Sequence, residues 1–134
     1  MTSIPCFFVS DLHGSEHRYG ALFSAVERDR PAAVFLGGDL LPHRWSSGAN
    51  ENDFIDDVLV EGFRSLRSRL GADAPKVFII LGNDDDRSSE PGFLDGDREG
   101  LWIYLHERWS EVGSHPVFGY AIVPPTPFQL KDWE

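Results

Sequence analysis

The segment IPCFFVSDLHG, residues 4–14, joins an apolar run to a carboxylate and an imidazole that stand one residue apart. An apolar run of this length with polar flanks predicts a buried strand from Ile4 to Val9. Asp11 and His13 then follow the carboxyl end of that strand, which is the edge where open α/β sheets bind ligands. The segment therefore predicts the first strand of a sheet and the first two residues of a site.

Two further strands and two helices are predicted after this segment. Apolar residues at helical spacing predict a helix from Ser15 to Asp29, and a short apolar run predicts a strand from Ala32 to Leu36. A second helix has its apolar face between Ile55 and Leu70, and Lys76 to Leu81 is the third predicted strand. Right-handed crossovers lay such strands parallel. The expected fold class is α/β, with a βαβαβ unit in the first part of the chain.

A different pattern follows the third predicted strand. The segment from Arg87 to Gly100 is rich in Ser, Gly, Pro and Asp, which predicts a loop that could cover the site. Three short segments separated by the turns His106-Glu107 and Gly113-Ser114 then predict an antiparallel meander, over Leu101 to Leu105, Arg108 to Val112 and Val117 to Val123. Because 134 residues lie within the range of one domain and we find no internal repeat, residues 1–134 are expected to form one domain.

Composition and charge limit the classes of function. The chain has 134 residues, of which 41% are hydrophobic, so a globular domain with one core is expected. The formal net charge of -10 argues against general binding to nucleic-acid phosphates. An acidic surface does favour divalent cations, and a bound cation can create a phosphate site. Phosphate chemistry at a metal therefore stays open.

Cysteine content and hydropathy bear on the compartment. Cys6 is the single cysteine, which excludes an intrachain disulfide, and we expect it to pack in the first strand as a small hydrophobe. No apolar run approaches the length of a membrane span, and no basic segment precedes the first apolar run. The sequence thus predicts a cytoplasmic protein without a membrane partner.

Each predicted strand is followed by residues that can bind metals. Asp11 and His13 follow the first strand, Asp39 follows the second, and Asn83 follows the third. Imidazole together with oxygen ligands suits Mn, Fe or Zn, and Mg is favoured where oxygen dominates. A carboxylate can also bridge two cations about 3.5 to 4 Å apart in phosphoryl chemistry. We expect these four residues to be the ligands of a divalent-metal site.

The motifs Asp11-Leu12-His13, Gly38-Asp39 and Gly82-Asn83-Asp84-Asp85 resemble, in order and spacing, the first three motifs of the calcineurin-like metallophosphoesterases. The likeness runs from Ile4 to about Val123. By position, the resemblance implies that Asp11 and His13 bind one metal, that Asp39 bridges both metals, and that Asn83 binds the second metal. The resemblance implies a four-layer α-β-β-α sandwich and hydrolysis of a phosphate ester by a metal-bound hydroxide.

The sequence departs from the family pattern in two places. Asp84 stands where the family commonly has a His that assists the leaving group or binds phosphate, which shifts the expected substrate towards a phosphodiester or an activated leaving group. Asp84 and Asp39 are the candidate catalytic residues, and Asn83 and His43 are the candidates for substrate binding. The family's later half supplies a lone His and a Gly-His-x-His motif, which this sequence lacks. The chain therefore resembles the amino-terminal half of such an enzyme, and a homo-oligomer or a separate carboxyl-terminal half is the expected partner.

The remaining polar residues have plainer predictions. We expect His17 to face solvent on the first helix, and His106 and His115 to lie in turns of the meander. For Asp85 and Asp86 three alternatives stay open: they orient the metal ligands, bind a stray cation, or are simply solvated.

Two hypotheses from different classes stay open. The first is a divalent-metal-dependent phosphoesterase, most simply a phosphodiesterase. The second is a non-catalytic metal-binding or interaction module, which would hold about one metal weakly or none, and would expose an apolar surface. Phospho-acceptor domains also place Asp residues at strand ends, but they need an acidic pair after the first strand, where this chain has Asp11 and His13.

Overall fold

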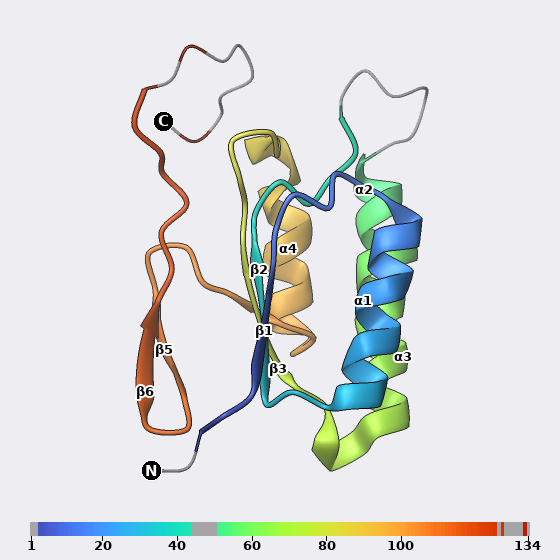
Figure 1. The fold of residues 1–134 in the computed structure, drawn as a ribbon. Helices are drawn as coiled ribbons and strands as arrows, with labels where there is room; N and C mark the ends of the chain where they lie inside the picture. Colours follow the sequence, from blue (N-terminus) through green and yellow to red (C-terminus); the bar gives the residue numbers. More distant parts are fainter. Residues whose placement is uncertain (1–2, 44–50, 126, 128–132, 134) are drawn as a thin grey trace.

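A parallel sheet of four strands runs through the molecule in the order β1-β2-β3-β4, and a separate two-stranded sheet lies beside it (Figure 1). The computed structural model describes residues 3–43, 51–125, 127 and 133. The four strands of the main sheet are β1 (Cys6–Val9), β2 (Ala33–Gly37), β3 (Lys76–Ile80) and β4 (Ile103–Tyr104). The predicted α/β class and the three predicted parallel strands are confirmed.

Helices cover one face of this sheet (Figure 1). The first is α1 (Glu16–Asp29). The second is one continuous helix, made of α2 (Glu51–Phe54), the π-helical η1 (Ile55–Val60) and α3 (Glu61–Leu70), and the short turn η2 (Gly71–Asp73) follows it. The last is α4 (Glu90–Arg98). The predicted apolar faces of the first two helices are buried, as Tyr19 and Val26 in α1 and Leu59 and Leu66 show. Gly71 ends the second helix with a φ of 54°, a conformation that suits glycine. The core therefore lies between the sheet and this helical layer.

The segment from Arg87 to Gly100 is not a loop, so that prediction is wrong. It forms a short turn of helix, η3 (Arg87–Ser89), followed by α4. Pro91 lies in the first turn of α4, where its missing N–H would have no partner anyway, and Phe93 is fully buried. A Cβ atom at Gly96 would overlap the indole of Trp102, so glycine at this position lets the helix approach the chain that follows. Tertiary packing here overrides a composition that favours turns.

The last part of the chain does not form a three-stranded meander. β4 pairs parallel with β3 and becomes the fourth strand of the main sheet, so the prediction was wrong about its partner. The other two predicted runs do form an antiparallel hairpin, β5 (Trp109–Val112) with β6 (His115–Phe118), which turns at Gly113. A short apolar run does not reveal in which direction its partner strand runs, which explains the error.

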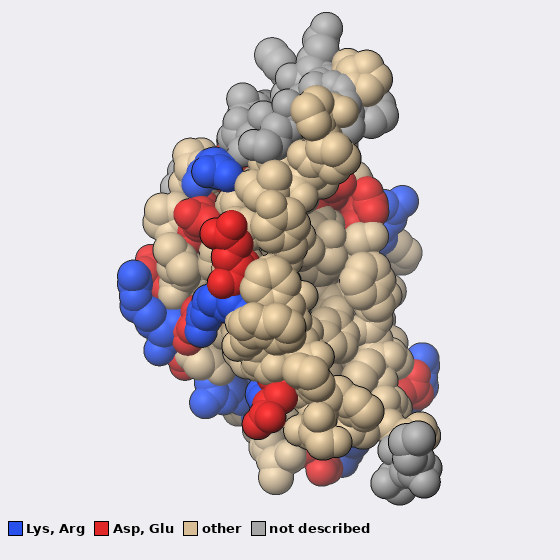
Figure 2. All heavy atoms as spheres, turned by 90° about the vertical axis from the view of Figure 1, so that its left-hand side faces the viewer, with Lys and Arg blue, Asp and Glu red and all other residues tan. Residues whose placement is uncertain are grey.

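The β5–β6 hairpin lies over part of the face of the main sheet that is opposite the helices (Figure 1). Phe8 on this face is 71% exposed, and Tyr120 is 56% exposed. Cys6 lies two residues before Phe8 in the same strand and is exposed as well, so the prediction that it packs inside is wrong. Figure 2, which views the molecule from the hairpin side, shows mostly uncharged side chains over its centre. An apolar surface is therefore present on this side.

Among the helices of the described residues, none combines the length and the apolar character needed to cross a membrane.

Candidate metal site

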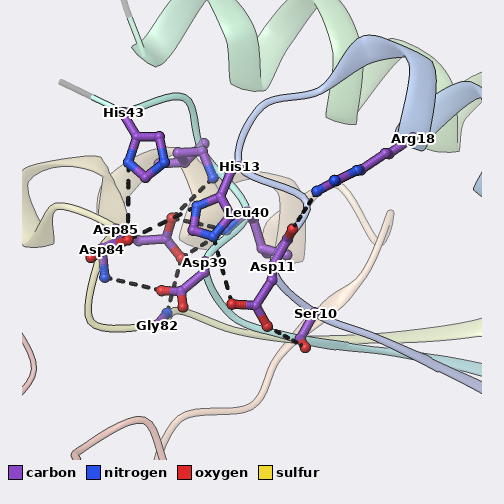
Figure 3. Close-up of polar contacts among 11 residues, drawn as sticks. Ser10, Asp11, His13, Arg18, Asp39, Leu40, His43, Gly82, Asp84 and Asp85 are labelled. Atoms are coloured by element: carbon purple, nitrogen blue, oxygen red, sulfur yellow. Dashed lines mark hydrogen bonds and ion pairs between the residues drawn. The ribbon is translucent and has the colours of Figure 1, made fainter. Parts of the chain in front are cut away.

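Loops that follow β1, β2 and β3 meet at one edge of the main sheet and carry the predicted site residues (Figure 3). The backbone N–H of Asp11 donates to Gly38 O at 3.0 Å, and that of His13 donates to Asp39 O at 2.9 Å. These bonds continue the pairing of the first two loops beyond the ends of β1 and β2. The side chains that follow the two strands are therefore held in a fixed relation.

Three of the predicted ligands adopt a backbone conformation that is uncommon outside glycine. The φ angles are 59° at Asp11, 44° at His13 and 54° at Asp39. Such conformations cost free energy and persist where surrounding contacts fix them, which happens most often at functional sites. Their coincidence at one sheet edge indicates that this edge is built to aim particular side chains.

A first group of possible ligands consists of Asp11, His13 and Asp39, whose ligand atoms all lie within 4.8 Å of one another. Nε2 of His13 lies 3.6 Å from Oδ1 of Asp11. Ser10 donates from Oγ to Oδ2 of Asp11 at 2.7 Å, and this hydrogen bond is the main cause that lowers the pKa of the Asp11 carboxyl. Asp11 is thus held as a carboxylate, the form that binds cations.

Asp39 lies deeper, between the ends of β2 and β3. Its Oδ1 accepts a hydrogen bond of 3.0 Å from the backbone N–H of Asp84. Burial raises the pKa of Asp39, and the nearby carboxylates of Asp84 and Asp11 raise it further. Three carboxyl groups gathered in this way repel one another, and a bound cation would remove that repulsion.

A second group of possible ligands consists of His13, His43 and Asp84. The rings of His13 and His43 are stacked, with centroids 4.6 Å apart and planes inclined by 17°. Oδ2 of Asp84 lies 4.0 Å from Nδ1 of His13 and 3.9 Å from Nδ1 of His43. The sequence predicted substrate binding for His43 and catalysis for Asp84, and the structure brings both residues against the predicted ligand His13.

Asn83 follows Gly82 in the turn after β3 and is half-buried. The structure thus places it at the same edge of the sheet, next in sequence to Asp84, which contacts Asp39. Its roles as a metal ligand and in substrate binding stay predictions.

Asp85 holds together the loops that carry the site. The sequence had left open whether it orients the metal ligands, binds a stray cation or is simply solvated. It is 1% exposed, and its carboxylate accepts hydrogen bonds from the backbone N–H groups of Leu40 at 3.0 Å, Leu41 at 2.9 Å and Gly82 at 2.9 Å. Burial raises the pKa of Asp85 to about 6. One side chain therefore ties the loop after β2 to the loop after β3. The sequence Asp84-Asp85-Asp86 alone gives no sign that Asp85 is the buried residue of the three.

Two other supporting residues were not predicted. Tyr19 of α1 is fully buried and donates from its hydroxyl to Leu40 O at 2.9 Å. Trp133 is 1% exposed, donates from Nε1 to Asp85 O at 2.9 Å, and stacks on the guanidinium of Arg87 with 4.5 Å to the ring centroid. The sequence placed Tyr19 on the apolar face of the first helix and gave no role to Trp133, so it indicated nothing about the site for either residue.

The other histidines lie outside these groups. His17 is exposed on α1, as predicted. His106 is not merely a turn residue, because its Nδ1 accepts a hydrogen bond of 3.0 Å from the N–H of Ala121. His115 begins β6 rather than lying in a turn.

The chemistry of the donor set fits a divalent metal ion. Nδ1 of His13 is buried and has no hydrogen-bond partner among the described residues. Imidazole nitrogens and several carboxylates within one small region match the ligand preferences of Mn, Fe and Zn. Asp11, His13 and Asp39 could hold such an ion, and so could His13, His43 and Asp84.

No family model matches the sequence, and no curated protein matches it. A solved crystal structure has a similar fold, with a TM-score of 0.57 and 14% sequence identity, and the alignment covers 97% of this chain. At this identity the likeness shows the fold alone, a mixed α/β arrangement. The chain spans 58% of the length of that structure.

Proposed function

We propose that the protein is a divalent-metal-dependent phosphoesterase that hydrolyses phosphodiesters. The observation that carries this proposal is the convergence of Asp11, His13 and Asp39, whose ligand atoms lie within 4.8 Å of one another at the sheet edge where α/β folds bind ligands. The likeness of the three motifs to those of the metallophosphoesterases supports the same reaction. On this proposal the chain forms half of a four-layer α-β-β-α sandwich.

The residues have distinct roles in the proposed site. Asp11 and His13 hold the cation from the loop after β1, and Asp39 reaches it from the loop after β2. The position of Asp39 between Asp11 and Asp84 suits a carboxylate shared by two cations, and Asn83 is the proposed further oxygen ligand. A divalent cation bound here supplies activation of water and neutralisation of negative charge on the phosphate.

The charge of the site favours a diester as the substrate. Asp84 is half-buried and carries a carboxylate where a phosphate would approach, beside Asp39 and Asp11. A phosphate monoester has a charge of about -1.5 to -2 at neutral pH, whereas a diester has only one negative charge. Repulsion by the carboxylates is therefore weaker for a diester. His43, which has 48% of its side chain exposed and lies beside Asp84, is the proposed contact to the substrate.

A non-catalytic interaction module is the second candidate, and one observation favours it. The face opposite the helices exposes large apolar side chains, namely Phe8, Trp109, Phe118 and Tyr120. A patch of this kind marks a surface that binds another polypeptide. A second copy of the chain or a separate polypeptide is the proposed partner.

The single cysteine, which excludes an intrachain disulfide, favours the cytoplasm as the proposed compartment.

Hydrolysis of bis(p-nitrophenyl) phosphate by the purified protein tests the proposal. We expect turnover with Mn²⁺, loss of turnover on chelation, and recovery when Mn²⁺ is restored. A rate equal to that of a blank with Mn²⁺ alone would contradict the proposed activity and leave the interaction module as the better account.

A further inference from the structure

We propose that Arg18 binds an anionic group on one arm of the diester, so that the site selects diesters that carry an additional phosphate. This inference rests on the proposed function and deepens it by naming a residue that recognises the substrate. Arg18 lies in the first turn of α1 and is exposed. Its Nη1 donates to the backbone O of Asp11 at 3.1 Å (Figure 3). The fold therefore holds a guanidinium beside a predicted metal ligand.

The guanidinium of Arg18 keeps its charge available at this position. It contacts the backbone carbonyl of Asp11 and not a carboxylate, and none of the described residues forms an ion pair with it. A guanidinium has several N–H donors in a planar fork that matches the oxygens of a phosphate. The donors that Asp11 does not use can therefore bind a phosphate group of the substrate.

The charges around the predicted metal ligands are arranged asymmetrically. Asp84 lies on one side of Asp39, and its Oδ2 is 3.9 Å from Nδ1 of His43. Arg18 lies on the other side, next to Asp11 (Figure 3). The carboxylate of Asp84 repels an anionic substituent, whereas the guanidinium of Arg18 attracts one. A diester bound between them has its anionic arm directed towards Arg18 and its other arm towards His43.

Support of the backbone at Asp11 does not account for the charge of Arg18. The φ of Asp11 is 59°, so contacts that fix this residue matter. Two other contacts already do so: its N–H donates to Gly38 O at 3.0 Å, and Ser10 Oγ donates to its Oδ2 at 2.7 Å. A neutral donor would serve the carbonyl equally well. The positive charge is therefore the feature of Arg18 that the substrate explains.

Two substrates that differ by one phosphate test this assignment. Thymidine 5′-(p-nitrophenyl phosphate) is a diester, and its 3′-phosphate derivative carries the added phosphate on the same arm. With the full-length chain saturated with Mn²⁺, we expect kcat/KM to be about tenfold higher for the 3′-phosphate derivative. The gain should lie mainly in KM, because the added phosphate is remote from the reacting atoms. R18Q should lose this preference, and R18K should keep part of it.

The R28Q variant is the matched control, because Arg28 is exposed in the last turn of α1 and pairs with Asp29. It should keep the preference for the added phosphate. Both R18Q and R28Q should keep the Mn²⁺ content and the thermal unfolding of the unchanged protein. Calorimetric titration with thymidine 3′,5′-bisphosphate and thymidine 5′-phosphate measures the same selection without turnover. The bisphosphate should bind about tenfold tighter to the unchanged protein and to R28Q, and no tighter to R18Q.

Three results would overturn the inference. They are an unchanged protein that binds the two nucleotides equally, an R18Q protein that still prefers the bisphosphate, and an R18Q protein that loses Mn²⁺ which R28Q retains. The last result would mean that Arg18 only supports Asp11. Absence of diester turnover contradicts the proposed function instead, and the titrations still decide the role of Arg18.

Discussion

The backbone N–H of Asp84 donates to the Asp39 carboxylate at 3.0 Å, which links the loop after β3 to the loop after β2. Oδ1 of Asp39 also lies so close to Gly82 that a Cβ atom there would overlap it. Asp39 is thus fixed by protein contacts alone, in a position between the carboxylates of Asp11 and Asp84. A ligand that is positioned before the cation arrives loses little conformational freedom on binding.

Replacing Gly82 tests this arrangement. A Cβ atom at Gly82 must displace the Asp39 carboxylate or the backbone beside it. We expect G82A to lower the free energy of unfolding by about 1–3 kcal/mol and to weaken Mn²⁺ binding at least about tenfold. Urea unfolding and calorimetric titration with Mn²⁺ measure the two effects.

The G20A variant provides the control for that substitution. Gly20 lies within α1, is exposed, and has open space where its Cβ would be. Alanine there should raise the free energy of unfolding by about 0.5–1 kcal/mol and leave Mn²⁺ binding unchanged. Equal Mn²⁺ affinities in G82A and G20A would show that Gly82 does not position the metal ligand.

The buried carboxyl of Asp85 makes stability depend on pH. Burial raises its pKa from 3.8 to about 6 in the folded protein, so the folded state binds the proton more tightly than the unfolded state. The stability that this group contributes is therefore complete below pH 3.8 and is lost as the pH rises through about 6. By this group alone, the free energy of unfolding should fall by about 2 kcal/mol from pH 4 to pH 7.

Urea unfolding at a series of pH values, on the unchanged protein and on D85N, measures this contribution. Asparagine turns an N–H₂ group towards backbone donors, so we expect D85N to lose about 1–3 kcal/mol at pH 5 and to show a flatter pH dependence between pH 4 and 7. D53N, at an exposed position on α2, should keep the slope of the unchanged protein. Parallel slopes for D85N and the unchanged protein would mean that Asp85 is not the titrating group.

Trp133 should matter for stability far more than an exposed tryptophan does. It is 1% exposed, and its Nε1 donates to Asp85 O at 2.9 Å. We expect W133A to lower the free energy of unfolding by about 3–5 kcal/mol, and to reduce Mn²⁺ affinity because Asp85 loses this support. W109A removes a side chain that is 72% exposed, and it should cost less than about 1 kcal/mol. Thermal or urea unfolding of the two variants separates these expectations, and similar losses would contradict the role given to Trp133.

Much of the sheet could be predicted because its signals are local. The runs that became β1, β2 and β3 are apolar and short, and the helix between the first two has its apolar residues at helical spacing. Asp11, His13 and Asp39 were found as neighbours because parallel strands end at the same edge. Their meeting follows from topology and does not depend on any detail of side-chain packing.

What the sequence did not reveal depends on contacts between distant segments. α4 contains Gly92 and Gly96, which are poor helix formers, and its helical state depends on burial of Phe93 and on Trp102 against Gly96. The pairing of His43 with Asp84 joins two loops whose spacing in sequence carries no motif. The burial of Asp85 was hidden in a run of three identical residues.

Metal content and diester hydrolysis, measured on the same preparations of the unchanged protein and D39N, test the central claim most directly. Asn keeps the shape of Asp39 but lacks the charge of a shared carboxylate ligand. The account predicts that the unchanged protein binds Mn²⁺ and hydrolyses bis(p-nitrophenyl) phosphate, and that D39N loses turnover by at least about a hundredfold together with its tightly held Mn²⁺. A D39N protein that holds as much Mn²⁺ and turns over as fast as the unchanged protein would contradict the account.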